Sequence, residues 1–153
     1  MVKVVPRAEL ASYIGQDLEA GEWFLVDQQR IQQFADVTLD HQFIHIDPDK
    51  AKQTPFGGTI AHGFLTLSLL THLTSQCALV PEEVVMGINY GFDKVRFISP
   101  VKTGAEVRAM VNILEVDQRG DGQILVKQGI TVEIRGEDKP ALVCEWLALY
   151  VCS

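Results

Sequence analysis

The chain has 153 residues, of which 47% are hydrophobic and 22% are charged, so it has enough apolar side chains for a packed core. Its formal net charge of −7 disfavours nucleic acid and anionic membrane surfaces as general partners. The first residues lack the unbroken apolar run of a secretory signal, which predicts a cytosolic location without membrane attachment.

Short helices and a strand are predicted in the first part of the chain. Residues 6–14 have a proline near the first turn and a glycine after the last residue, as in a short helix. Residues 22–26 are rich in aromatic and β-branched side chains, which predicts a strand. Asp27 is expected to cap an amphipathic helix that ends by Leu39.

A connecting loop is predicted next, over residues 40–46. Asp47 and Pro48 carry the N-cap and first-turn signals of another short helix, through Lys52. The side chains of Asp40 and His45 are therefore expected on a loop between two helices.

The stretch 54–81 contains no Asp, Glu, Lys or Arg, which indicates a buried environment. Its apolar residues point in every helical direction, so we expect one long core helix over 60–80, buried on all sides. The pair Gly57-Gly58 would open this helix and Pro81 would close it. Polar residues interrupt the stretch too often for a lipid-facing span.

Beyond residue 81 the apolar period changes from 3.6 to about 2, the period of strands. Turn residues separate the strand-like runs, which predicts mostly antiparallel connections. The runs cover 84–90, 92–99, 105–117, 123–135 and 141–151. A bent antiparallel sheet around one apolar helix, an α+β architecture in a single domain over 1–153, satisfies both patterns. A second copy would cover its edges and open side.

The segment richest in chemistry is DHQFIHIDPDKAKQTPFGGTIAHGF, residues 40–64. It supplies a carboxylate at Asp40 and an imidazole at His45, followed by His62-Gly63 at the start of the predicted buried helix. Adding water to an enoyl thioester requires one proton to leave water and one to reach the α-carbon, and this pair around one water can do both. Their reference pKa values, about 3.9 and 6.5, leave the acid and base roles undivided because the two groups titrate as a pair.

This segment resembles the motif of MaoC-type dehydratases and (R)-specific enoyl-CoA hydratases of the hot-dog fold, in the branch that includes NodN-like proteins. That motif runs Asp-x-Asn-Pro-(Ile/Leu)-His, then an acidic-Pro helix start, then Gly-x-Ile-x-His-Gly. The matching positions are Asp40, Ile44, His45, Asp47, Pro48, Gly58, Ile60, His62 and Gly63. Segments 89–91 and 94–104 also resemble the family's first long strands, so the resemblance covers most of the chain. Gln42-Phe43 departs from the family's Asn-Pro, whose proline fixes the loop.

The resemblance implies hydration of trans-2-enoyl-CoA to (R)-3-hydroxyacyl-CoA by an Asp40–His45 dyad, in a homodimer formed through its sheets. It implies no metal or redox cofactor. Coenzyme A is part of the substrate. Gly63 at the helix start is the natural N–H donor to the thioester oxygen, and it lets the substrate approach closely. His62 could line the pocket or serve as a hydrogen-bonded scaffold, and both readings stay open.

Other polar residues have less specific signals. His72 is predicted to be a core histidine, and Ser68 and Thr71 to let strands approach the helix. His41 and His45 have the spacing of a His-Glu-x-x-His zinc motif, but Gln42 replaces the glutamate and a loop does not align positions four apart, so no metal site is predicted.

Cationic side chains and cysteines have signals that are also of low specificity. Cationic side chains on the predicted strands could bind the phosphates of coenzyme A or be ordinary solvated charges; they are Lys94, Arg96 and Lys102. The cysteines are widely spaced without a CxxC pair, which predicts reduced thiols; they are Cys77, Cys144 and Cys152.

Two other functions remain open at this stage. Many hot-dog thioesterases place a catalytic carboxylate on or beside the central helix, and residues 54–80 contain none. A NodN-like protein that binds an acyl thioester without turning it over would keep the same fold, and only Gln42-Phe43 favours that alternative.

Overall fold

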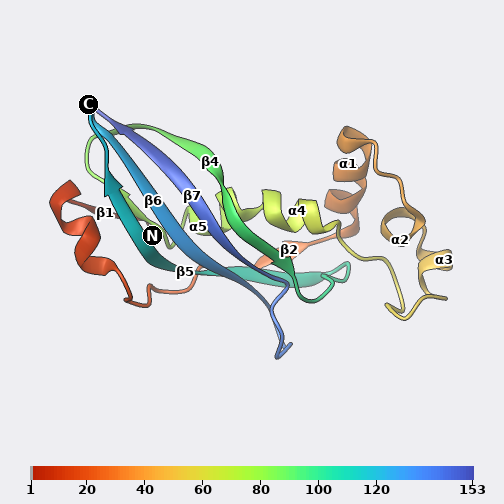
Figure 1. Ribbon diagram of the computed structural model, residues 1–153. Coiled ribbons are helices and arrows are strands. Elements are labelled where there is room, and N and C mark those ends of the chain that lie inside the picture. Colours follow the sequence, from red (N-terminus) through yellow and green to blue (C-terminus); the bar gives the residue numbers. More distant parts are fainter. Residues whose placement is uncertain (1) are drawn as a thin grey trace.

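A curled antiparallel sheet forms the body of the protein, in a computed structural model that describes residues 2–153 (Figure 1). The strand order is β2-β5-β6-β7-β4, and each neighbouring pair is antiparallel. The strands are β2 (Phe24–Val26), β4 (Val84–Phe97), β5 (Ala105–Gln118), β6 (Gln123–Ile134) and β7 (Leu142–Cys152). A separate parallel pair joins β1 (Lys3–Val5) to β3 (Leu79–Pro81). The predicted α+β architecture is confirmed.

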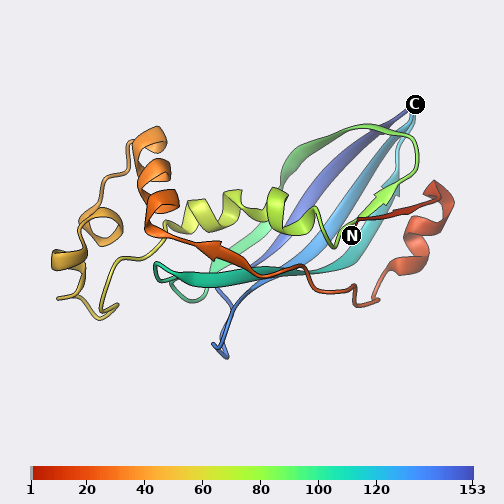
Figure 2. The same ribbon diagram turned by 180° about the vertical axis from the view of Figure 1, so that it is seen from behind.

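Burial alternates along β6 and β7, as expected for strands with one face on the core. The inward side chains, such as Val132 and Leu142, are fully buried. The concave face holds the central helix, which consists of α4 (Gly63–Ser68) and α5 (Leu70–Thr74) (Figures 1 and 2). The apolar residues that recur at every second position therefore form the face of the sheet that packs on the core.

The central helix is shorter than predicted. Its hydrogen bonds continue across the join between α4 and α5, because the N–H of Leu73 donates to the carbonyl of Leu69 at 2.9 Å. Residues before Gly63 are extended instead of helical, since the N–H of Ile60 donates to Ile44 and that of Ala61 to Val101. At the other end, Leu79–Pro81 forms β3 instead of a last helical turn.

The prediction that this helix is buried on all sides was also wrong for the single chain. Leu65, Leu70 and Leu73 face the sheet and are buried, whereas the side chain of Phe64 is 68% exposed. The outer face carries His72, which is exposed and meets the ring of Phe24 edge-on at 4.6 Å, so it is not a core histidine.

The two predicted strands 84–90 and 92–99 are one strand, β4. Gly91 was expected to separate them, but it lies within the strand at a break in its register with β7. Register breaks of this kind bend a strand without ending it, which lets β4 follow the curl of the sheet.

Short helices lie at the two ends of the central helix (Figure 2). The 3-10 helix η1 (Arg7–Tyr13) is at one end, and α1 (Gln28–Thr38), α2 (Phe43–Ile46) and α3 (Pro48–Ala51) are at the other, beside the start of α4. The predicted caps of α1 and α3 are confirmed, because Asp27 accepts from the N–H of Arg30 at 2.9 Å and Asp47 from that of Lys50 at 3.1 Å.

The structure also bears on the cysteines and on membrane-spanning helices. The three cysteines are buried free thiols, as predicted. Among residues 2–153, no helix has the length and apolarity needed to cross a membrane.

Candidate active site

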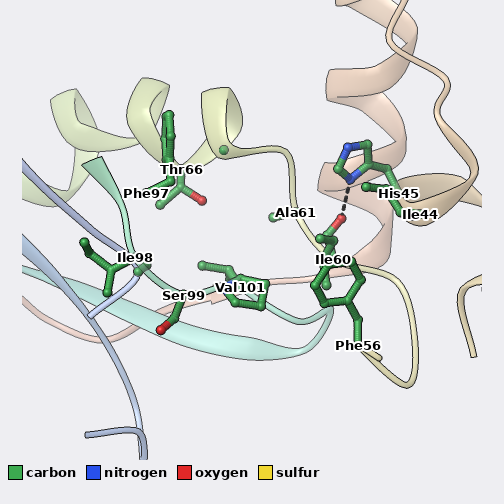
Figure 3. A pocket seen from close by; sticks show the side chains of 13 residues that line it. Ile44, His45, Phe56, Ile60, Ala61, Thr66, Phe97, Ile98, Ser99 and Val101 are labelled. Atoms are coloured by element: carbon green, nitrogen blue, oxygen red, sulfur yellow. Dashed lines mark hydrogen bonds between the residues drawn. The ribbon is translucent and has the colours of Figure 1, made fainter. Parts of the chain in front are cut away.

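His45 lies on α2, where the sequence predicted a loop, and its side chain is buried. Its Nδ1 is 2.7 Å from the carbonyl oxygen of Ile60 (Figure 3). A carbonyl can only accept, so Nδ1 carries the proton and Nε2 keeps a free lone pair in the neutral ring. Burial is the main cause that lowers the pKa of His45, and the neighbouring His62 lowers it further, against the raising effects of the Ile60 bond and of Asp40. The ring is therefore a neutral base near neutrality.

The backbone of α2 accounts for the departure from Asn-Pro. Gln42 precedes the helix with φ −59° and ψ 136°, the extended geometry that a residue before proline adopts. Phe43 occupies the first helical position, where proline would also fit because its missing N–H has no helical partner. Phe43 therefore stands where the family's proline would, without changing the type of backbone at this position.

Asp40 lies on the loop between α1 and α2 and is exposed. The preceding Leu39 ends α1 in the left-handed region, with φ 63° and ψ 19°. The main-chain carbonyl of Asp40 accepts a hydrogen bond from Nε2 of His62 at 3.0 Å, whereas its carboxylate has only a long contact of 3.4 Å with the N–H of Gln42. The loop is held by its backbone, and the carboxylate remains free to bind.

His62 contacts both Asp40 and His45. Its ring is buried and stacks on the ring of His45, with centroids 3.8 Å apart and planes 25° apart. Its Nε2 donates to Asp40, and its buried Nδ1 has no hydrogen-bond partner among the described residues. The side chain acts as a scaffold for the Asp40 loop while it also lines the cavity around Asp40 and His45.

The three side chains come close enough to raise the question of a metal. One nitrogen or oxygen atom each of Asp40, His45 and His62 lies within 4.8 Å of the others. Histidine lone pairs lie in the ring plane, so two stacked rings direct theirs side by side instead of at one ion. We therefore do not assign these residues as metal ligands. The side chain of His41 points elsewhere and pairs with Asp36 at 2.9 Å.

Two adjoining cavities meet at this cluster. The smaller, of about 270 Å³, contains Asp40, His45 and His62, and the larger, of about 410 Å³, is mostly apolar. Figure 3 shows the larger one from close by, lined by side chains of α2, α4 and the segment after β4. His45, Gly63 and Phe97 line both cavities, so the imidazole faces the apolar space as well as the carboxylate.

Gly63 begins α4 and has an ordinary helical backbone. Its N–H belongs to the first turn, where no residue of the helix itself can accept it. A Cβ at this position would lie 3.0 Å from the ring of Phe97, which is tighter than ordinary contact. The sequence offered close approach of a substrate as the reason for this glycine, and the Phe97 ring is a second reason.

Sequence reasoning missed two residues that hold the site together. Gln28 donates from Nε2 to the carbonyl of His45 at 2.8 Å and accepts a hydrogen bond from the hydroxyl of Thr59. No local signal distinguished Gln28 from its neighbouring glutamines on α1, because its contacts lie far along the chain.

Of the cations considered for coenzyme A binding, Lys94 pairs with Glu145 at 3.7 Å, as an ordinary strand charge would.

Comparison with known proteins places this chain in a family. The family described as "MaoC like domain" matches residues 9–134, so the chain belongs to the MaoC-like dehydratase family. Nodulation protein N of Rhizobium leguminosarum bv. viciae is 49% identical over 143 residues, which cover 93% of this chain and 89% of that protein.

A mycobacterial enzyme and a solved structure complete the comparison. The 3-hydroxyacyl-thioester dehydratase Z of Mycobacterium tuberculosis (strain ATCC 25618 / H37Rv) is 44% identical over 144 residues, covering 94% of this chain and 95% of that protein. The R-hydratase PhaJ1 from Pseudomonas aeruginosa aligns with a TM-score of 0.73 at 24% identity, covering 99% of this chain and 89% of that one. The predicted family and the hot-dog fold are confirmed.

Proposed function

We propose that this protein reversibly hydrates trans-2-enoyl-CoA to (R)-3-hydroxyacyl-CoA, with Asp40 and His45 as the catalytic pair. The observation that carries the proposal is the bond from Nδ1 of His45 to the Ile60 carbonyl, which leaves Nε2 bare at the edge of an apolar cavity. The carboxylate of Asp40, held only by a long contact with the Gln42 N–H, lies in the same cluster of side chains. Membership in a dehydratase family and the likeness to a 3-hydroxyacyl-thioester dehydratase support the reaction class. The R configuration rests on the family resemblance alone.

The two groups act on one water molecule. As the water oxygen bonds to C3 and the C2–C3 double bond opens, one O–H bond breaks and its proton passes to the pair. The pair returns one proton to C2, so its own charge is the same before and after the reaction. The bare Nε2 of a neutral His45 and the carboxylate oxygens of Asp40 can both accept a hydrogen bond from the same water.

The developing charge on the thioester oxygen needs a donor. The N–H of Gly63 lies at the positive end of the central helix, and Gly63 lines both cavities, which favours this N–H for the role. No step requires a metal or a redox cofactor, because addition of water moves only protons and one carbon–oxygen bond. The apolar cavity of about 410 Å³ offers space for part of the acyl thioester.

A homodimer is the proposed assembly. β4 is at the edge of the sheet, and an edge of unpaired N–H and C=O groups invites pairing with another chain. Five of its apolar side chains, over residues 85–92, are 38% to 63% exposed in the single chain; they are Val85, Met86, Ile88, Tyr90 and Phe92.

Light scattering tests the dimer. We expect Ile88→Asp to dissociate it to a 17.0 kDa particle and Val37→Asp, an equally drastic change on the exposed side of α1, to leave it intact. A wild-type particle of 17.0 kDa across the micromolar range would rule the dimer out.

A spectrophotometric assay with crotonyl-CoA tests the reaction. Loss of the enoyl absorbance without free thiol is the expected result, and it should be reversible from (R)-3-hydroxybutyryl-CoA. Release of thiol would instead identify a thioesterase. Saturable binding without either change, for short and long acyl chains, would identify a binding protein and end the proposal.

A further inference from the structure

Gln28 lies at the first position of α1, and its side-chain amide spans two segments that are far apart in the sequence. Nε2 donates to the carbonyl oxygen of His45 at 2.8 Å. On the other side, Oε1 accepts from the hydroxyl of Thr59 at 2.5 Å, and Thr59 is buried. Both ends of the amide are thus satisfied, one by each segment.

These bonds close a ring of contacts around the imidazole. Thr59 precedes Ile60, whose carbonyl accepts from Nδ1 of His45 and whose N–H donates to Ile44. The same amide therefore fixes both the main chain that carries the imidazole and the main chain that orients it. Because α2 is a single short turn, its last carbonyls have no helical partner, and Gln28 supplies one.

We propose that Gln28 is a positioning residue for His45, acting through Thr59 to keep the imidazole in the tautomer that leaves Nε2 bare. In catalytic terms this rests on the proposed function, but the tautomer itself does not. A displacement of about 1 Å in a reacting group can cost roughly 10²-fold in rate, so a residue that touches no substrate can still control turnover.

Few titratable groups lie close to His45. Asp40 approaches from the loop before α2 and His62 from the segment before α4, and α1 contributes only the neutral amide of Gln28. On α3, Lys50 pairs with Asp47 at 3.1 Å. Gln28 is therefore the neutral group through which α1 contacts the backbone of His45, and a carboxylate in its place could not donate to the His45 carbonyl.

The test is Gln28→Glu, which preserves shape and the acceptor for Thr59 but sets a carboxylate oxygen against the His45 carbonyl. Gln29→Glu is the matched control, because it adds the same charge at the next, exposed position of α1. We expect kcat to fall roughly 10- to 100-fold in Gln28→Glu with KM for crotonyl-CoA within about threefold, and no change in Gln29→Glu. Thr59→Val should reproduce the loss and Thr59→Ser should restore most of the activity.

Nitrogen NMR of the histidine rings gives a readout that needs no turnover. The wild type and Gln29→Glu should show His45 protonated at Nδ1 and bare at Nε2, whereas Gln28→Glu should show mixed tautomers. Wild-type kcat together with the wild-type tautomer in Gln28→Glu would overturn the proposal. If the wild-type protein hydrates nothing, the proposed function fails, and the tautomer alone decides the role of Gln28.

Discussion

The two members of the proposed catalytic pair are held in opposite ways. His45 is buried, and its Nδ1, its main-chain N–H and its carbonyl are all hydrogen-bonded. Asp40 is exposed, and only its backbone is firmly held, by His62. If the pair acts as proposed, the imidazole is in place before the substrate binds and the carboxylate reorients to meet the water. Removal of either group tests how far turnover depends on it.

The largest expected effect comes from that removal. Asp40→Asn and His45→Gln should each lower kcat/KM for crotonyl-CoA by roughly 10²–10⁴-fold, because each loses proton transfer at little steric cost. The double variant should be little worse than either single one, since the groups act as a unit. Circular dichroism should show an intact fold in each. Turnover close to wild type in a single variant would remove that residue from the mechanism.

Gly63→Ala probes the proposed oxyanion donor. We expect kcat to fall roughly 10²–10³-fold, as when one donor is lost, while the melting temperature is retained. The added methyl also meets the ring of Phe97, so Gly63→Ala combined with Phe97→Leu is the control. Activity that returns in the double variant would show that crowding of the ring, and not the thioester, caused the loss.

The pH dependence sharpens the contrast between the buried and the exposed group. The folded-state pKa of His45 lies below its ordinary value of about 6.5, so between the two values the unfolded chain binds more protons than the folded one. Stability from the neutral ring is therefore complete above about pH 6.5 and is lost as pH falls through the lowered pKa. Unfolding in urea at several pH values should show this slope in the wild type and a smaller one in His45→Gln.

The same shift should appear in the rate. kcat/KM should stay level as pH falls past about 6.5 and decline, roughly tenfold per pH unit, only when His45 itself is protonated. A decline that begins above that pH would mean that the ring is not desolvated as the structure indicates.

The smallest effect concerns the backbone in front of Asp40. Leu39 has φ 63° and an exposed side chain, so Leu39→Gly removes left-handed strain and loses no packing. Thermal unfolding should show a gain of about 1 kcal/mol in the free energy of unfolding. Val37→Gly, inside α1 and also exposed, should instead lose roughly 0.5 kcal/mol, because glycine is the poorer helix former. No gain in Leu39→Gly would show that this conformation stores no strain.

Local sequence signals predicted the features that depend on neighbouring residues. The caps at Asp27 and Asp47 and the period-2 burial of β6 and β7 depend on neighbouring residues, and each was confirmed. Gly91 misled because a glycine inside a strand and one at its end look alike in sequence.

The rest of the site depends on contacts far along the chain. Residues 60–62 lack charge, as a buried helix does, yet they are extended because Ile44 and Val101 supply their hydrogen bonds. The bonds of Gln28 to His45 and Thr59 are equally long-range. The motif indicated which side chains to consider, and only the tertiary structure shows which nitrogen of His45 is free.

Hydration of crotonyl-CoA in D₂O, followed by NMR of the product, tests the central claim most directly. If Asp40 and His45 act together on one water from one side of the substrate, the product carries a single deuteron at C2, in one of its two positions, on one enantiomer at C3. Asp40→Asn should form that product roughly 10²–10⁴-fold more slowly. Equal deuteration of both C2 positions in the initial product, or no addition of water by the wild-type protein, would contradict the account.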